Sequence, residues 1–327
     1  MKKFVNAIDD ILSESLSGFA SAHSSLVTLD PENKFVRRTR LTPNKVALIS
    51  GGGSGHEPLH AGLVGKGMLD AACPGQIFTS PTPDQIVEAA AAVGGAQGVL
   101  FIVKNYAGDR MNFEMAAEVY EGRAVSVVTN DDVAVDKSTY SEGRRGVAGT
   151  LVVEKIVGAA AEKGTDLQGC ADLAKEINAR TKSIGVALTS CTVPAAGTPT
   201  FSLGEDEMEI GVGIHGEPGR RRVKLTSADD IAEQMVGAIL SDYESRPSGP
   251  ALLLVNGFGA TPALELYVMY NAASRLLKKH GITIARSLVG SYVTSLDMAG
   301  CSITVSLLDD KLAALWDDPV HTAALRW

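Results

Sequence analysis

The feature that most constrains the fold is a repeated alternation of short apolar runs with segments of helical periodicity. Residues 46–49 (VALI), 98–104 (GVLFIVK) and 124–128 (AVSVV) are short and rich in apolar, often β-branched residues. Apolar residues at helical spacing follow two of these runs, at residues 58–64 and 111–120. Strands that alternate with helices in this way predict a largely parallel sheet flanked by helices. The sequence therefore predicts an α/β fold for the first half of the chain.

Several helices are predicted in this half from periodicity and capping signals. Thr82 and Gln85 have the spacing of a capping box, and Pro83 stands at the first helical position, so a helix is expected through residues 86–93. Pro58 is expected to open another helix, which ends near residues 65–67. Further helices are predicted at residues 5–19, 151–163 and 167–179.

The pattern changes near residue 183, and two domains of moderate size suit a chain of 327 residues. The predicted domains are residues 1–183 and residues 184–327, the second being a smaller α/β domain with a mixed sheet. Its one long helix is expected at residues 263–279, capped by Gly281. Its predicted strands are residues 184–188, 208–214, 252–255 and 303–307.

Two segments in different halves of the chain each place a histidine among glycines. Residues 211–219 (GVGIHGEPG) surround His215 with glycines, and residues 50–58 (SGGGSGHEP) do the same for His56. Glycine-rich loops allow backbone angles and close approaches that other residues do not. A lone histidine in a turn is usually structural, but two such loops predict one site assembled from distant parts of the chain.

The segment around His56 resembles several known motifs without satisfying their physical requirements. The glycine spacing fails the dinucleotide fingerprint, the phosphate-binding loop and the nucleophile elbow. Residues 56–60 (HEPLH) match the zinc motif H-E-x-x-H. That motif needs both histidines on one helical face, and Pro58 places His56 before the helix, so the sequence argues against zinc.

Lys104 and Asp109 stand where ligands gather in parallel sheets, after the carboxyl end of a predicted strand. Lys104 is expected to hold a hydroxyl or a transferring phosphate, although it could also end a strand in solvent. Asp109 is expected to cap the next helix, which is compatible with a role as general base.

Other polar residues are interpreted as structural. The histidines in this group are His23, His60, His280 and His321. The pairs Asp131–Asp132 and Asp309–Asp310 are interpreted as turn residues, and the basic run 220–224 as a solvated loop.

Composition and charge limit the classes of partner. The net charge of -8 argues against nucleic acid as the main partner. No apolar run approaches the length of a membrane span, and Asp9 and Asp10 interrupt any signal-peptide core. The four cysteines have no metal-binding spacing, and a reducing cytoplasm is the expected compartment.

Taken together, five motifs resemble the K domain of dihydroxyacetone kinases. They are residues 50–58, 73–83 (CPGQIFTSPTP), 104–109 (KNYAGD), 211–219 and 295–304 (SLDMAGCSIT), and they cover essentially the whole chain in order. The resemblance implies a cytoplasmic two-domain α/β subunit, usually a homodimer, that binds dihydroxyacetone covalently.

The resemblance also implies roles for particular residues. His215 matches the histidine whose Nε2 adds to the ketone carbon to form a hemiaminal, and His56 and Asp109 match the acid–base residues of the family. Such chemistry is reasonable, because neutral imidazole is a nucleophile toward carbonyls and covalent capture fixes the terminal hydroxyl group. The residues expected to bind the substrate are Gly53, Ser54, Gly55, His56, Ser80, Lys104, Asp109 and His215.

No metal and no cofactor are expected on this chain. The resemblance implies that Mg²⁺ and ADP or ATP belong to a separate L subunit, with an M-type phosphoryl-relay subunit where the kinase is linked to the bacterial phosphotransferase system. Since the sequence stops at Trp327, a stand-alone substrate-binding subunit is expected. Two alternatives remain open: a non-catalytic dihydroxyacetone-binding sensor or co-activator, and a kinase subunit for another hydroxyketone such as erythrulose or glyceraldehyde.

Overall fold

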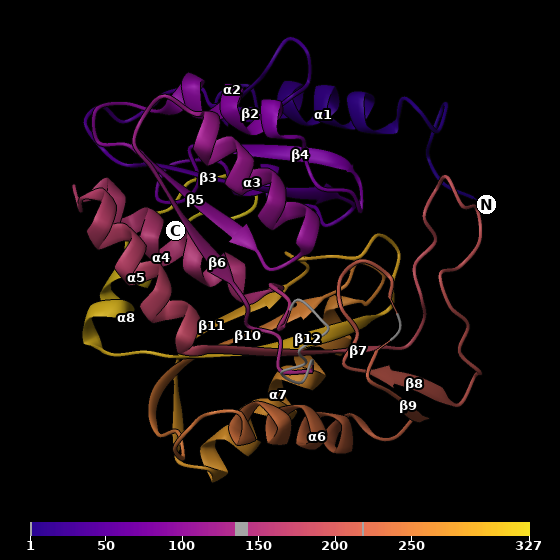
Figure 1. The fold of residues 1–327 in the computed structure, drawn as a ribbon. Coiled ribbons are helices and arrows are strands. Elements are labelled where there is room, and N and C mark those ends of the chain that lie inside the picture. The colour runs from indigo at the N-terminus through magenta and orange to yellow at the C-terminus, as the bar shows by residue number, and fades with distance from the viewer. Residues whose placement is uncertain (1, 135–142, 218) are drawn as a thin grey trace. The chain divides into compact units, whose positions relative to one another are not determined.

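The computed structural model describes residues 2–134, 143–217 and 219–327, so Pro218 of the 211–219 motif lies outside the described residues. The chain forms two compact units, each with its own sheet (Figure 1). The first unit comprises Met1–Thr129, Leu151–Glu176 and Ala314–Trp327, and the second comprises Asn130–Thr150 and Ile177–Ala313.

These units are discontinuous, whereas the sequence analysis divided the chain once, at residue 183. Residue 183 lies inside strand β7 (Thr181–Ala187) of the second unit. Two helices, α4 (Gly149–Glu162) and α5 (Leu167–Ala179), return most of their residues to the first unit before the chain enters the second again. The assignment of α4 and α5 to the first unit depends on packing between residues far apart in the chain, which local composition does not predict.

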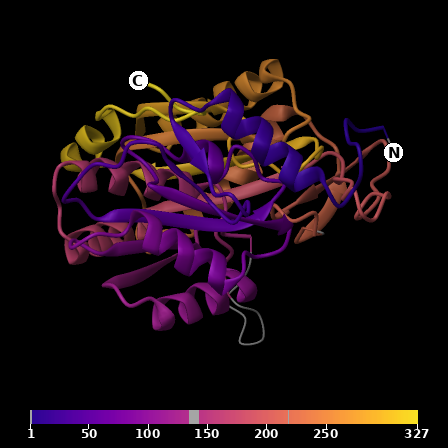
Figure 2. The same ribbon diagram turned by 90° about the horizontal axis from the view of Figure 1, so that it is seen from above.

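The first unit is built on a six-stranded sheet in the order β1-β2-β4-β3-β5-β6. The four strands β4, β3, β5 and β6 are parallel, and β1 and β2 extend them as an antiparallel edge, so the prediction of a largely parallel sheet is confirmed. Figure 2 shows this sheet, in indigo and purple, from above. The strands are β1 (Val27–Leu29), β2 (Val36–Arg38), β3 (Ala47–Ser54), β4 (Ala71–Ile77), β5 (Val99–Lys104) and β6 (Ala124–Thr129).

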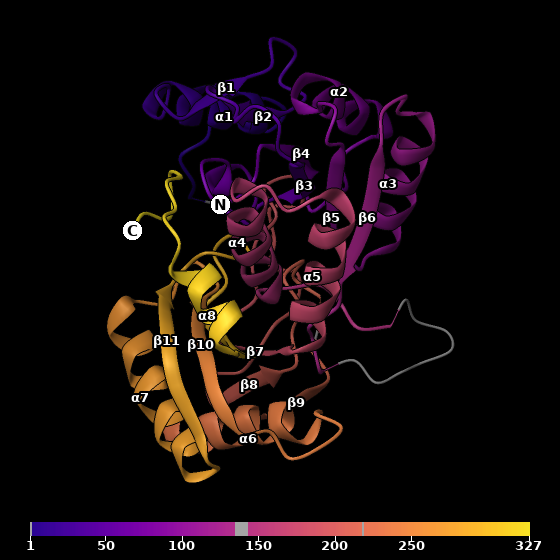
Figure 3. The same ribbon diagram turned by 90° about the vertical axis from the view of Figure 1, so that its left-hand side faces the viewer.

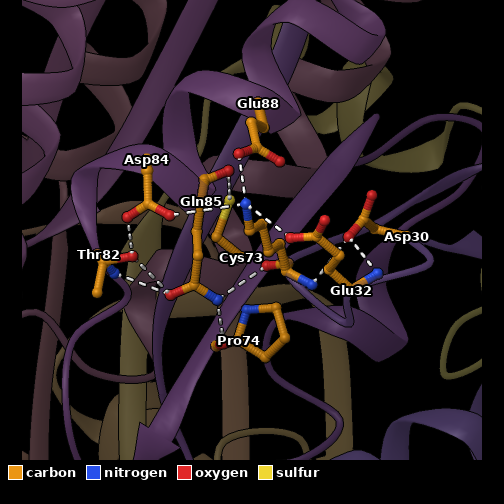
Figure 4. A network of polar contacts seen from close by, with 9 residues as sticks. Asp30, Glu32, Cys73, Pro74, Thr82, Asp84, Gln85 and Glu88 are labelled. Carbon is orange, nitrogen blue, oxygen red and sulfur yellow. Dashed lines mark hydrogen bonds and ion pairs between the residues drawn. The ribbon is translucent and has the colours of Figure 1, made fainter.

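Helices α2 (Pro83–Val93) and α3 (Ala107–Val119) pack against this sheet and against each other. As predicted, α2 begins with a capping box in which Thr82 and Gln85 satisfy each other's backbone amides. Figure 4 shows that Gln85 also reaches the carbonyl oxygen of Pro74, at 3.2 Å from its Nε2. Gln85 therefore caps the N-terminus of α2 and also connects this helix to β4 by a hydrogen bond.

The remaining helices of the first unit include α1 (Ile11–Ala22), which begins later than predicted, and a single 3-10 turn, η1 (Ala61–Leu63). The prediction of an α-helix after Pro58 is wrong, because the structure has only the 3-10 turn η1 there. Gly62, Gly65 and Gly67 follow one another closely there, and the chain makes close backbone approaches, as where Gly158 of α4 meets the carbonyl oxygen of Gly67. A continuous helix would have separated these backbones. Helix α4 is buried along nearly its whole length.

The second unit has a six-stranded sheet in the order β11-β10-β12-β7-β8-β9. The sheet is mixed, as predicted. Among the strand pairs that the structure describes in this sheet, only β10 and β11 are parallel. Helices α6 (Ala228–Ser241) and α7 (Ala263–Lys279) pack side by side against it (Figure 3). The other elements are β8 (Glu207–Ile210), β9 (Arg221–Lys224), β10 (Gly249–Gly257), β11 (Ile282–Gly290), β12 (Gly300–Leu307) and α8 (Asp310–Asp317).

Several of these elements differ from the sequence prediction. The basic run expected to be a solvated loop is the edge strand β9, whose Arg222 pairs with Glu209 of β8. Helix α7 is not the only long helix, because α6 precedes β10. Within the described part of the chain, no helix combines the length and the apolar character required to cross a bilayer.

Candidate active site

The first unit gathers polar side chains at the carboxyl ends of β3, β4 and β5. The glycines expected to form a loop after residue 50 are instead the end of β3, which continues to Ser54. A Cβ atom on Gly51 would lie 2.6 Å from the carbonyl oxygen of Cys73, and one on Gly52 would lie 2.1 Å from Nζ of Lys104. These glycines therefore allow close approach rather than a flexible loop.

Lys104 is the last residue of β5, and its side chain is fully buried. Its Nζ donates to the carbonyl oxygen of Gly51 at 2.8 Å, and it lies 2.9 Å from Nε2 of His60 and 3.2 Å from Oδ2 of Asp109. An ammonium group has three donors, and each has one of these acceptors. Lys104 is thus held inside the unit rather than ending the strand in solvent.

Asp109 lies in the first turn of α3, because this helix begins at Ala107 and its N-cap is Tyr106. The prediction that Asp109 is the cap itself is therefore wrong. The carboxylate is buried beside Lys104 and lies near the positive end of the helix dipole. A carboxylate held in this way can accept a proton from a hydroxyl group placed against it.

The other predicted site residues of the first unit lie nearby. The ring of His56 is buried and stacks on Phe78, with ring centroids 5.1 Å apart. A Cβ atom on Gly53 would lie 2.6 Å from the amide nitrogen of Thr79, and one on Gly108 would lie 2.7 Å from Oγ of Ser80. Ser54 donates through Oγ to the carbonyl oxygen of Gly75, at 2.7 Å, and the amide of Gly55 donates to the carboxylate of Glu57.

His60, interpreted from the sequence as a histidine with no convergent partner, belongs to this cluster. Its Nδ1 lies 2.8 Å from Oε1 of Glu154 on α4, and its Nε2 faces Lys104. Both ring nitrogens are therefore in polar contacts, which leaves neither for a zinc ion. The sequence analysis did not single out Glu154, because residues 60 and 154 are far apart in the chain.

Burial changes the proton affinity of this inner pair. It lowers the pKa of His60 well below its usual value, with further contributions from the charges of Lys104 and His56. It raises the pKa of Glu154 to about 8, although Lys104 and Ser50 act in the opposite direction. A neutral imidazole and a protonated carboxyl group are therefore the expected forms near pH 7.

His215 belongs to the second unit, in the segment that follows β8, and its side chain is partly exposed. Its backbone amide donates to Oε2 of Glu217 at 2.9 Å. Gly216 has a φ of 73°, and a Cβ atom there would lie 2.6 Å from Sγ of Cys191. Here the glycine serves a left-handed turn, as the sequence analysis expected of this loop.

Arg145, which the sequence analysis did not single out, supports this segment. Its Nη1 lies 2.9 Å from Oε1 of Glu217, and its Nη2 donates to the carbonyl oxygen of Gly211 at 2.8 Å. Its guanidinium group also pairs with buried Asp132, at 2.6 Å. Arg145 thus connects both ends of the segment that carries His215.

The aspartates interpreted as turn residues have defined structural roles. Asp131 is buried and accepts from the amides of Val147 and Gly149, at the start of α4, and from Oγ of Ser183. Burial raises the pKa of Asp132 to about 6 against the influence of Arg145. Over the ranges that the structure describes, no three His, Cys, Asp or Glu side chains form a group able to hold a metal ion.

Comparison with known proteins adds to this geometry. The model of the Dak1 domain matches residues 17–324. The chain belongs to the Dak1 family. One relative is the dihydroxyacetone-binding subunit DhaK of the PEP-dependent dihydroxyacetone kinase of Escherichia coli. Its sequence is 50% identical to this chain, over 100% of this chain and 99% of the relative's own length. The corresponding subunit of PTS-dependent kinase 1 of Listeria innocua is 47% identical over 99% of this chain and 100% of its own.

Two of the solved structures of similar fold have different described functions. The dihydroxyacetone kinase of C. freundii has a TM-score of 0.86 at 33% identity, over 98% of this chain and 60% of that chain. The dihydroxyacetone kinase operon co-activator Dha-DhaQ has a TM-score of 0.90 at 34% identity, over 98% of both chains. Structures similar to this chain therefore include both a kinase and a co-activator.

Proposed function

We propose that this chain is the dihydroxyacetone-binding subunit of a dihydroxyacetone kinase linked to a phosphotransferase system. The relatives of highest identity described above are such subunits, and they match this chain over nearly their full length. A D-erythrulose kinase of Mycolicibacterium smegmatis is 40% identical but extends further, because this chain covers 57% of it. The proposed acceptor is therefore a small hydroxyketone, with dihydroxyacetone first and erythrulose second.

In this proposal His215 captures the ketone. Its Nε2 lone pair forms a bond to the carbonyl carbon, the carbon–oxygen π bond breaks, and the ring loses its Nδ1 proton as the oxygen becomes a hydroxyl group. No atom leaves, so the product is a hemiaminal. The hydrogen bond from the amide of His215 to Glu217 and the pairing of Glu217 with Arg145 support a fixed position for the histidine backbone. Glycerol has no carbonyl group and cannot be captured.

Asp109 is the proposed base for the transfer step. Its carboxylate accepts the proton of the terminal hydroxyl group as that oxygen attacks phosphorus, and His56 acts beside it as the second acid–base residue. Lys104 provides a fixed positive charge against Asp109, and Gly53, Ser54, Gly55 and Ser80 surround the bound triose. The single observation that carries this step is the buried contact between Lys104 and Asp109, at 3.2 Å.

The phosphoryl donor belongs to a partner in this proposal. The C. freundii kinase is described in complex with AMP-PNP and Mg²⁺, and this chain matches 60% of it. A separate L subunit is therefore proposed to hold Mg²⁺ and ADP or ATP, with an M-type subunit relaying the phosphoryl group. The proposed assembly is a cytoplasmic homodimer of this chain with its L partner.

A co-activator function is the second candidate, because the co-activator Dha-DhaQ has the same fold. Binding alone needs capture by a histidine but no base, and the presence of His56, Lys104 and Asp109 beside one another favours turnover. The curated DhaK subunits that match this chain over nearly its full length, at 46–50% identity, belong to kinases.

One experiment separates these functions. The protein is mixed with the L subunit of a closely related kinase, that kinase's phosphoryl donor and dihydroxyacetone, and triose phosphate is measured. Phosphorylation by the parental protein and none by Asp109→Asn is the expected result. Capture of dihydroxyacetone without any transfer, under conditions in which the related K subunit is active, would favour the co-activator function instead.

A further inference from the structure

His60 and Glu154 extend the candidate active site into the core of the first unit. Nδ1 of His60 lies 2.8 Å from Oε1 of Glu154, and its Nε2 lies 2.9 Å from Nζ of Lys104. Lys104 in turn contacts Asp109. All of these side chains are buried, and they come from four separate segments: the residue before η1, helix α4, strand β5 and helix α3. A continuous line of polar contacts therefore leads from Glu154 to the proposed base.

The donors and acceptors along this line allow one arrangement of protons. An ammonium group can only donate, so Nε2 of His60 accepts from Lys104. A neutral imidazole whose Nε2 accepts carries its proton on Nδ1, and that N–H donates to Glu154. The low pKa of His60, caused first by burial and then by the charge of Lys104, keeps the ring neutral.

We infer that His60 and Glu154 are positioning residues for the proposed transfer reaction, because together they fix the direction of the Lys104 ammonium group toward Asp109. The inference rests on the proposed function. Each N–H bond of Lys104 has one acceptor, on Gly51, His60 and Asp109 respectively. Loss of the acceptor on His60 frees the ammonium group to turn away from Asp109.

Glu154 acts on Lys104 through the position of the His60 ring. Without an acceptor at Nδ1, the buried ring N–H would have no partner, and the ring would turn toward another acceptor, which takes Nε2 out of line with Lys104. Lys104 would then lose its acceptor on His60 and would move. A carboxyl group and a carboxamide both present an oxygen to Nδ1, whereas an apolar side chain presents none.

The test uses the complete kinase, that is, this subunit with an L partner and its donor, and compares Glu154→Gln with Glu154→Leu. Glu154→Leu is expected to lower kcat about 100-fold, as misplaced catalytic groups do, with KM for dihydroxyacetone nearly unchanged. Glu154→Gln is expected to retain most of kcat. The matched control is Glu162→Leu on the same helix, because Glu162 contacts Arg38 and Thr42, away from the line of contacts that leads to Lys104. Its kcat is expected to stay at the parental value.

A second measurement does not depend on activity. Nitrogen NMR of isotope-labelled histidine is expected to place the proton of His60 on Nδ1 in the parental protein, and to show a weaker hydrogen bond at Nε2 in Glu154→Leu. A parental His60 protonated on Nε2, or a parental kcat in Glu154→Leu, would overturn the inference. If the parental protein transfers no phosphate at all, the proposed function fails, and the NMR result alone decides whether His60 and Glu154 direct Lys104.

Discussion

Nζ of Lys104 lies 3.2 Å from Oδ2 of Asp109, and both side chains are buried in the first unit. A buried charge is unfavourable unless an opposite charge and hydrogen bonds compensate for it. Here the carbonyl oxygen of Gly51 and Nε2 of His60 provide the remaining acceptors for Lys104. Removal of either side chain would leave the other charge buried without its partner. A substitution of Lys104 or Asp109 is therefore expected to affect both the proposed reaction and the free energy of unfolding.

Replacement of the cation tests this dependence. Lys104→Met leaves the carboxylate of Asp109 buried without its cation, and the expected loss in the free energy of unfolding is about 3–5 kcal/mol. Urea unfolding followed by circular dichroism measures it. Lys34→Met is the control, since Lys34 pairs with Glu32 and Glu88 at the solvent-exposed surface and its loss is expected to have little effect. Equal losses of unfolding free energy in Lys104→Met and Lys34→Met would show that the buried ion pair contributes no more to stability than the surface one.

The glycine beside Lys104 offers a test without removing a charge. Gly52→Ala would place a Cβ atom 2.1 Å from Nζ of Lys104, so the end of the lysine side chain must move. We expect phosphoryl transfer to fall strongly. The free energy of unfolding is expected to fall as well, because Gly52 has a φ of 158°, which side chains rarely adopt. Gly18→Ala is the control. Residue 18 lies inside α1, where a Cβ atom would meet no neighbouring group within 4 Å, and alanine there is expected to stabilise the helix by about 0.5–1 kcal/mol.

The segment that carries His215 can be tested separately. Glu217→Ala removes the acceptor of the His215 amide and the partner of Arg145. We expect capture of dihydroxyacetone to weaken about tenfold or more, in line with the loss of a charge-assisted hydrogen bond. Native mass spectrometry measures the mass added by one intact dihydroxyacetone. Glu205→Ala, on the exposed segment before β8, is expected to capture as the parental protein does, and His215→Ala not at all.

The sequence predicted local elements better than contacts between residues far apart in the chain. The apolar strand at residues 98–104 and the capping box of α2 are local patterns, and the structure contains both. The glycines after residue 50 were expected to form a loop, because composition alone does not distinguish glycine needed for a turn from glycine needed for close approach. The role of Gly52 depends on its neighbour Lys104 on the adjacent strand β5. The sequence does not show which residues become neighbours across a sheet.

The same limit explains why His60 and Glu154 were missed as a pair. Their contact joins residues 94 positions apart in the chain, and a glutamate on a predicted helix normally indicates a solvated face. Arg145 and Glu217 are a similar case in the second unit. The one available signal was the position of Glu154 in a helix whose other residues are mostly apolar, Val, Ile, Leu, Ala and Gly.

The buried carboxyl group of Glu154 is expected to make stability depend on pH. Burial raises its pKa from 4.5 to about 8, so between these values the folded state keeps a proton that the unfolded chain releases. The stability linked to this proton is complete below the lower value and is lost as the pH rises through the upper one. The free energy of unfolding of the parental protein, relative to that of Glu154→Gln, is therefore expected to fall from pH 5 to about pH 8. Urea unfolding at several pH values measures this difference.

Glu162 on the same helix provides a control of opposite sign. Burial favours its proton, but Arg38, Lys45 and Thr42 together outweigh burial and lower its pKa. The stability from Glu162 is therefore present above the usual glutamate pKa and is lost as the pH falls through the lower folded value. Relative to Glu162→Gln, the parental protein is expected to lose stability toward acid and to show no loss toward pH 8. If both variants instead gave curves parallel to the parental one, the buried proton on Glu154 would not exist in the folded protein.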